Sequence, residues 1–149
     1  LTHQPFFSPR ERRDNVLLRQ HLLPVIRKRK VDLVLQGHDH VYGRLKSEAP
    51  TPMYVVSVAG AKQYRLSEEA RKTMRPVAED TQLFQVLRFD GPCLRYEART
   101  ATGRLYDAFD LVEGGAAGKQ LVEHAEGRIE ERTCTRAETL KGRADRCWE

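Results

Sequence analysis

The sequence predicts a mixed α/β fold, in which a strand–helix–strand unit is followed by a run of strands alone. Between about residues 14 and 28 the apolar residues recur at helical spacing, and residues 31–35 form a short, mostly apolar stretch typical of a buried strand. From residue 53 onward, apolar and β-branched stretches are separated by turn residues. This order favours a mixed sheet covered by helix over an all-β sandwich.

The predicted helix begins at Asp14, a residue type that caps helix N-termini well, and ends near Lys28. Pro24 lies well inside this stretch, so we expect a kink or a break near Leu22 and Leu23. The stripe expected to face the sheet consists of Leu18, Leu22, Val25 and Ile26, widened by Leu17 and Leu23.

The later strands are predicted from alternating or β-branched apolar stretches, at residues 53–59, 83–89, 93–100 and 105–112. The turns between the last three contain Gly91 and Gly103. These strands are expected to complete the sheet structure.

The domain organisation is predicted from a change of character after Gly114. From there the chain is charge-mixed and poor in large apolar residues, although residues 119–131 suit an amphipathic helix. We therefore expect one main domain at residues 1–113 and a charged appendage, mobile or helical, at residues 114–149.

Composition indicates a globular protein. The chain has 149 residues, of which 40% are hydrophobic and 32% charged, enough for one domain of ordinary size. No apolar run approaches the roughly 20 residues that a membrane helix needs, so no membrane span is expected. Three cysteines, Cys93, Cys134 and Cys147, leave free thiols and one optional bridge between the last two both open.

Positive charge is concentrated in the first third of the chain. Residues 1–46 hold 10 Lys and Arg against 4 Asp and Glu, a balance of +6. Such a field favours an anionic substrate such as a phosphoester, although the four cations at residues 27–30 are better explained as complements of the helix dipole. Nucleic acid is not the favoured partner, because no aromatic residues interleave with this basic cluster.

The strongest local motif is Gly37-His38-Asp39-His40, directly after the predicted strand at residues 31–35. Two histidines one residue apart point the same way if the chain stays extended, and neutral imidazoles suit ions such as Zn, Fe, Ni and Mn. Gly37 allows a close backbone approach or an unusual φ. On its own the motif is only moderately specific, since an isolated His-x-His is more often incidental.

His3 strengthens this interpretation. The chain begins Leu1-Thr2-His3, without an initiator Met, and these residues resemble the tail of a strand that starts upstream. The two strands of a right-handed β-α-β unit lie parallel, so their C-terminal ends meet at one edge of the sheet. We therefore expect His3, His38 and His40 to converge there.

These segments resemble the calcineurin-like, purple-acid-phosphatase-like metallophosphoesterases. The segment from His3 to Ser8 is similar to the family's metal-binding histidine with its Pro-aromatic-Ser loop, and the segment from Gly37 to Arg44 is similar to G-H-x-H with an H-x-Y-x-R extension. The resemblance covers residues 1–44 in matching order, is looser over residues 45–113 and is absent beyond them. Gln4 departs from relatives that often have a second His at that position.

The resemblance implies the C-terminal half of a four-layer α/β/β/α sandwich that holds two transition-metal ions, whether Fe, Zn or Mn. His3 and His38 would bind one metal and His40 the other, and the pair would activate hydroxide for attack on a phosphoester. Tyr42 and Arg44 are candidates for contact with the substrate phosphate, with packing against the helix as the alternative. The family's Asp ligands and Asn-His pair would lie upstream, so this chain alone is expected to be inactive.

Metal-dependent hydrolysis of phosphomonoesters is therefore the function that the sequence favours. The alternatives are a phosphodiesterase or nuclease of the same superfamily, and a degenerate phosphatase module that binds phosphate or a partner without turnover. Asp39 is expected to have a structural role or to orient the ligands, and His21 and His124 are expected to have none at the site. The sequence does not indicate the compartment or the oligomeric state.

Overall fold

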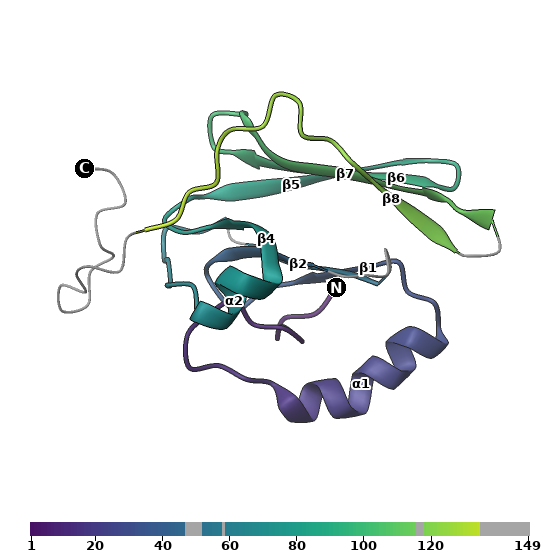
Figure 1. Cartoon of the computed structure of the whole chain (residues 1–149), viewed down its shortest axis with the longest axis horizontal. Coiled ribbons are helices and arrows are strands. Elements are labelled where there is room, and N and C mark those ends of the chain that lie inside the picture. The colour runs from purple at the N-terminus through teal and green to yellow at the C-terminus, as the bar shows by residue number, and fades with distance from the viewer. Residues whose placement is uncertain (47–51, 58, 116–117, 135–149) are drawn as a thin grey trace.

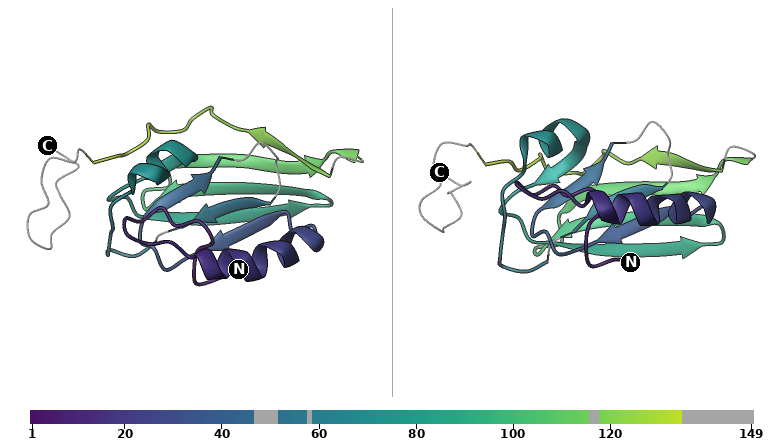
Figure 2. Two further views of the ribbon diagram at one scale, coloured as in Figure 1. Left: turned by 60° about the horizontal axis from the view of Figure 1, so that its bottom comes forward. Right: turned by 90° about the horizontal axis from the view of Figure 1, so that it is seen from below.

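The computed structural model describes residues 1–46, 52–57, 59–115 and 118–134 (Figure 1). Two four-stranded sheets pack face to face, and the helices α1 and α2 lie against the outer face of the first sheet. The same arrangement is visible from two further directions (Figure 2). The predicted mixed α/β class is confirmed. Neither helix in this described part has the length and apolar character needed to span a membrane.

The first sheet combines parallel and antiparallel pairs in the order β1-β3-β2-β4. Its strands are β1 (Leu33–Gln36), β2 (Tyr42–Leu45), β3 (Met53–Val56) and β4 (Met74–Ala78). β1 runs parallel to β3, whereas β2 is antiparallel to both of its neighbours. At the free edge of β1, Thr2 forms an isolated parallel bridge with Gln36, as expected of a strand tail.

The second sheet is an antiparallel meander in chain order. Its strands are β5 (Leu83–Asp90), β6 (Cys93–Thr100), β7 (Leu105–Glu113) and β8 (Lys119–Glu123). The predictions for β5, β6 and β7 are confirmed to within one residue at each end.

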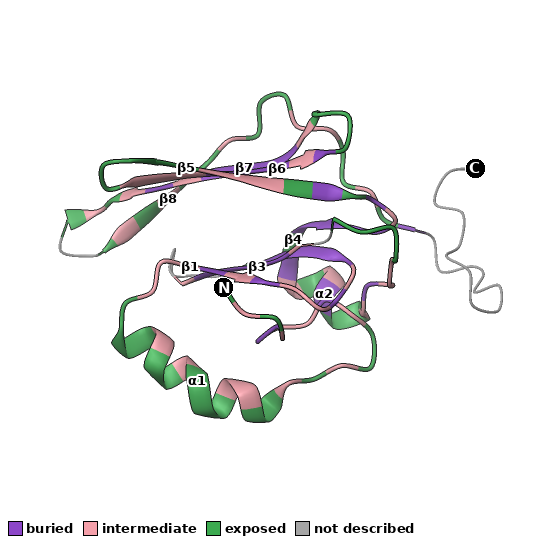
Figure 3. Ribbon diagram, turned by 180° about the vertical axis from the view of Figure 1, so that it is seen from behind, coloured by how far each residue is buried: buried purple, intermediate pink, exposed green. Residues whose placement is uncertain are grey.

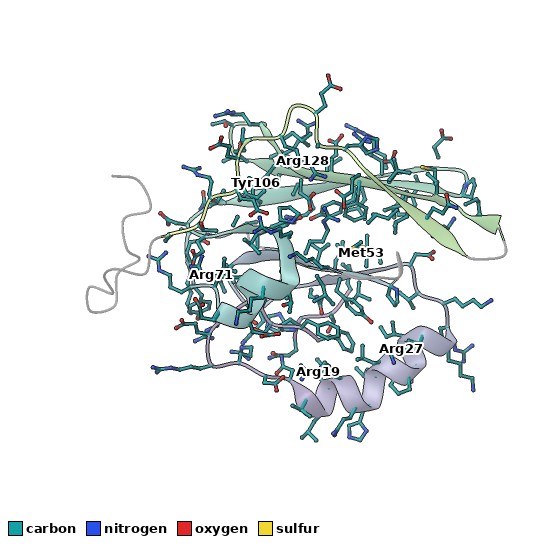
Figure 4. The ribbon with its side chains drawn as sticks, in the orientation of Figure 1. Arg19, Arg27, Met53, Arg71, Tyr106 and Arg128 are labelled. Atoms are coloured by element: carbon teal, nitrogen blue, oxygen red, sulfur yellow. The ribbon has the colours of Figure 1, made fainter. Side chains whose placement is uncertain are left out.

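The main core lies between the two sheets, and buried residues are found along strands of both sheets in Figure 3. Met53 and Tyr106 enter it from opposite sheets (Figure 4), and Tyr96 stacks on Phe109 with ring centroids 4.7 Å apart. Each large apolar side chain buried in this way contributes about 1.5–3 kcal/mol to folding. The packing of these inner faces therefore holds the two sheets together.

Helix α1 (Val16–Lys28) covers the other face of the first sheet. It continues through Pro24 without interruption, so the expected break is wrong. The residues that pack against the sheet are Leu18, Leu23 and Ile26, while Leu17, Leu22 and Val25 are exposed. The inner face is thus rotated from the predicted stripe. It also includes Arg19, whose Nη1 donates to the Phe6 carbonyl over 2.9 Å.

Helix α2 (Glu68–Thr73) is short and begins at Ser67, whose Oγ accepts a hydrogen bond from the backbone N–H of Ala70. It covers the β4 end of the first sheet through a small cluster of buried apolar residues. The helical layer therefore lies on one side of the sheet pair, and in the described residues no helix covers the outer face of β5–β8. The fourth layer of the expected sandwich stays a prediction.

The segment after Gly114 corrects the helix predicted there. Residues 119–123 form β8, paired with β7, and not the amphipathic helix expected over residues 119–131. Beyond β8, the backbone N–H of Ile129 donates to the Leu105 carbonyl and that of Arg132 to the Tyr106 hydroxyl. Backbone pairing at the edge of a sheet thus orders this segment, although its low apolar content predicted a mobile or helical appendage. Residues 135–149, including Cys147 of the optional bridge, lie outside the described residues.

A buried polar network also joins the two sheets. The Arg44 guanidinium on β2 donates from Nε to Asp107 Oδ2 over 2.8 Å and from Nη1 to Glu123 Oε1 over 2.6 Å. The hydroxyl of Tyr42 donates to Asp107 over 2.7 Å. Burial, and then the Asp107 charge, raise the pKa of Tyr42 well above its ordinary value, so this hydroxyl stays a donor. Arg128 is a second cation paired with Asp107, with its Nη2 3.0 Å from Asp107 Oδ1.

Replacing Arg44 is expected to destabilise the fold. Arg44→Met removes the main partner of a fully buried carboxylate and should lower the free energy of unfolding by about 3 kcal/mol. The matched control is Arg75→Met, because Arg75 forms an exposed ion pair with Glu131 and should cost less than about 1 kcal/mol. Urea denaturation measures both values. Equal losses in the two variants would contradict a structural role for the buried pair.

Candidate metal centre

His3 and His38 meet where two parallel strand ends reach the same edge of the first sheet. Thr2 donates its N–H to the Leu35 carbonyl over 3.0 Å and accepts from the Gly37 N–H over 3.2 Å. This register places the next residue of each chain segment side by side. His3 Nε2 lies 2.9 Å from His38 Nδ1, and the two rings meet edge to face with centroids 4.8 Å apart. The predicted convergence is confirmed for these two histidines.

His38 has a left-handed backbone, with φ of 65°. Residues other than Gly rarely adopt this conformation, and such strain concentrates at functional sites. The unusual φ therefore belongs to His38 and not to Gly37, where it was expected. A Cβ at Gly37 would meet only the His3 carbonyl oxygen, at an ordinary 3.6 Å.

Asp39 fastens the loop that follows His3. Its carboxylate is buried, accepts a hydrogen bond from the Ser8 hydroxyl and lies 2.9 Å from Arg13 Nε. Its negative charge also opposes the lowering of the His38 pKa. The predicted structural role of Asp39 is confirmed by these contacts.

His40 stands apart from the other two histidines, against the segment after β3. Its Nδ1 lies 3.0 Å from the Lys62 carbonyl oxygen. A carbonyl only accepts, so Nδ1 carries the proton and Nε2 keeps a free lone pair. The backbone N–H of Tyr64 donates to the His40 carbonyl over 2.9 Å, and the two rings meet edge to face at 5.3 Å. His40 is thus held in the tautomer in which Nε2 can bind a metal.

The donor set fits part of a metal site. Two imidazole nitrogens bound at about 2.1 Å and at right angles to one another lie about 3.0 Å apart, close to the 2.9 Å between His3 and His38. The same separation suits an N–H···N hydrogen bond, so one ring donates to the other when the pair holds no ion. Within the described ranges, no group of three or more His, Cys, Asp or Glu side chains could hold a metal ion. The expected three-histidine cluster is therefore not formed, and the ligand roles stay predictions.

The electrostatic surroundings favour a neutral His38. Its pKa lies below the ordinary value of 6.5, first through desolvation and then through the positive charges of Arg13, His3 and Arg10, against the opposing effect of Asp39. Neutral imidazole is the form that binds metal ions.

Tyr42 and Arg44 correct the predicted substrate contacts. Both follow His40 in the sequence, but residues two apart on a strand share a face, and on β2 this face points into the space between the sheets. Tyr42 is fully buried, and the Arg44 guanidinium is occupied by two carboxylates. Their contacts are those of structural residues and leave no donor for a phosphate at the histidines.

Sequence reasoning missed Arg10, Lys62 and Tyr64. The Arg10 guanidinium carbon lies 3.9 Å from the centroid of the Tyr64 ring, and Lys62 Nζ lies 5.0 Å from it. A hydrogen bond from Lys62, and the charges of Lys62 and Arg10, lower the pKa of Tyr64 below 10.0. The direction of β3 in the sheet could have indicated these residues. β3 runs parallel to β1, so the segment after it returns to the edge where the histidines lie.

The other histidines lie elsewhere, as predicted. His21 is on α1 and is exposed. His124 Nε2 pairs with Asp110 Oδ2 at 2.8 Å, on the second sheet.

Comparisons with known proteins support the fold alone. No family model and no curated protein matches the chain. One similar solved structure is described as "GAP50 the anchor in the inner membrane complex of Plasmodium", with 18% sequence identity and a TM-score of 0.61. The match covers 71% of this chain and 33% of that chain, so the chain spans about a third of its length.

We expect His3 and His38 to act together in binding a metal ion. In titrations with Zn²⁺ followed by calorimetry, His3→Ala and His38→Ala should each weaken binding by at least about tenfold, since each removes one of two adjoining ligands. His21→Ala is the control, because that ring is exposed on the helix. Unchanged Zn²⁺ affinity in both site variants would exclude the pair as ligands.

Proposed function

We propose that this chain is the C-terminal part of a metallophosphoesterase of the calcineurin-like kind, which hydrolyses phosphomonoesters. The observation that carries the proposal is the pairing of His3 with His38, whose ring nitrogens lie 2.9 Å apart at the ends of parallel strand segments. Carboxyl ends of parallel strands are where open α/β sheets bind ligands.

Each histidine has a distinct role in this proposal. His3 and His38 would share one ion, and His40 would offer Nε2 to a second while the Lys62 carbonyl fixes its tautomer. A bound metal pair supplies positive charge for the phosphate oxygens and a hydroxide for attack. The backbone pairing of Thr2 with β1 and the contacts of the buried Asp39 with Ser8 and Arg13 fix the segments that carry these rings, which favours binding with little rearrangement.

In this proposal the metal pair needs further ligands that members of the family have, namely two Asp residues and an Asn-His pair, and these would lie outside this chain. The similar solved chain is about three times as long as the part of it matched here. The activity is accordingly proposed for the protein that carries this chain together with those residues.

A binding module without turnover is the second candidate. The described residues hold two adjoining imidazoles and no third ligand beside them, as expected of a degenerate site. The similar solved structure is described as an anchor, a role that needs binding and no catalysis.

Activity and metal content together separate the two candidates. In the full-length protein, His38→Ala and His40→Ala should lose bound metal and lower the hydrolysis of p-nitrophenyl phosphate by at least about a hundredfold, because changes to residues behind the ligands already cost 10–100-fold. His21→Ala should keep both properties. The assay uses Zn²⁺, Mn²⁺ and Fe³⁺ in turn.

The outcomes are distinct. Metal binding without hydrolysis of either p-nitrophenyl phosphate or its bis-ester would favour the binding module. Preferential hydrolysis of the bis-ester would favour a phosphodiesterase. If the His38→Ala and His40→Ala variants are folded and keep the metal content and activity of the wild type, the proposal is wrong.

A further inference from the structure

We propose that Arg10 and Lys62, gathered on the Tyr64 ring beside His40, form a subsite for the dianionic phosphate of a phosphomonoester. The inference rests on the proposed function for its substrate, and it names residues that are not metal ligands.

Arg10 and Lys62 lack the carboxylate partners that neutralise many cations of this chain. Arg13, Arg19 and Arg71 are each paired with an Asp or Glu at 2.9 Å or less. In the part of the chain that the structure describes, no carboxylate pairs with Arg10 or Lys62, and the ring of Tyr64 is their shared contact. Their positive charge is therefore available to a ligand.

The position of these cations is set by backbone pairing. Arg10 forms an antiparallel bridge with Leu66, and the N–H of Ser67 donates to the Pro9 carbonyl over 2.8 Å. Tyr64 is tied to His40 by a backbone hydrogen bond of 2.9 Å and by the contact between their rings. The ring of Tyr64 thus contacts both the Arg10 guanidinium and His40, a proposed metal ligand.

Stacking on Tyr64 leaves the donors of Arg10 usable. A guanidinium that lies over an aromatic ring contacts it through its face, while its N–H groups point outward in the plane. Those groups match two phosphate oxygens, and charge-assisted hydrogen bonds of this kind are about twice as strong as neutral ones. Lys62 adds a second charge on the same ring. Arg44, the residue expected to do this, is occupied in the core.

Two unpaired cations select for the charge of the substrate. A phosphomonoester has a second pKa of about 6 and carries nearly two negative charges at pH 7, whereas a phosphodiester carries one. The Coulomb attraction to a fixed pair of cations is then about twice as large for the monoester. The subsite therefore favours monoesters, and this preference should be visible in binding alone.

The test measures binding of inorganic phosphate and of Zn²⁺ to the full-length protein by calorimetry at pH 7.5. Arg10→Gln should raise the Kd for phosphate by about fivefold or more, Lys62→Gln should raise it less, and Zn²⁺ affinity should stay unchanged. The matched control is Arg29→Gln, which removes the same charge from an exposed position at the end of α1. Circular dichroism checks that each variant is folded.

A second measurement compares phenyl phosphate with diphenyl phosphate. The wild type should bind the monoester more tightly, and Arg10→Gln should reduce that preference. An unchanged phosphate Kd in folded Arg10→Gln and Lys62→Gln proteins, or an equal loss in Arg29→Gln, would overturn the subsite. Absence of Zn²⁺ binding to the wild type would instead count against the metal centre. A weaker phosphate affinity in Arg10→Gln, with no such change in Arg29→Gln, would still support the subsite.

Discussion

The candidate site depends on the register between Thr2 and β1. Two backbone hydrogen bonds, from Thr2 to Leu35 and from Gly37 to Thr2, set that register, and it alone brings His3 beside His38. A slip of one residue would turn His3 to the opposite face, because side chains alternate along an extended chain. The buried Asp39 carboxylate stabilises this arrangement, because it accepts a hydrogen bond from Ser8 and pairs with Arg13, both in the segment that follows His3. The site is therefore built from backbone pairing first and from side-chain chemistry second.

The segment from His38 to Arg44 contributes residues to two different parts of the molecule. Its first residues turn at the sheet edge, where His38 adopts a left-handed backbone. Its last residues form β2, and their alternation sends Tyr42 and Arg44 into the space between the sheets. There Arg44 meets Asp107 of β7, so the same short motif joins the proposed metal centre to the packing of the second sheet. Residues that follow a candidate ligand by two and four positions can thus have contacts that serve stability alone.

The elements predicted well are those whose pattern is local. Alternation was enough for β5, and the turns at Gly91 and Gly103 were enough to delimit β6 and β7. The β-α-β unit was enough to bring His3 to His38. β4 was missed because Pro76 lies inside it, although an edge strand tolerates proline. β8 was missed because its pairing with β7 is a long-range contact that its own short, charge-rich sequence does not indicate. The contacts of Arg10 with Tyr64 depend on two segments more than fifty residues apart, and no local pattern reports such a contact.

Charge is distributed over this fold in a way that separates structure from function. On the outer face of the second sheet, Glu97 is nearly buried among Arg88, Arg95 and Arg99, and its pKa is lowered, mainly by the hydrogen bond from Arg99. Between the sheets, Asp107 and Glu123 neutralise Arg44 and Arg128. Cations paired in this way contribute little to the field outside the molecule, because each is cancelled at short range. At the sheet edge where the histidines lie, Arg10 of the first third and Lys62 after β3 are instead left without a carboxylate partner among the described residues. A fold that neutralises its interior and one sheet face, yet leaves two cations without carboxylate partners beside His40, adds to the attraction for anions at that edge.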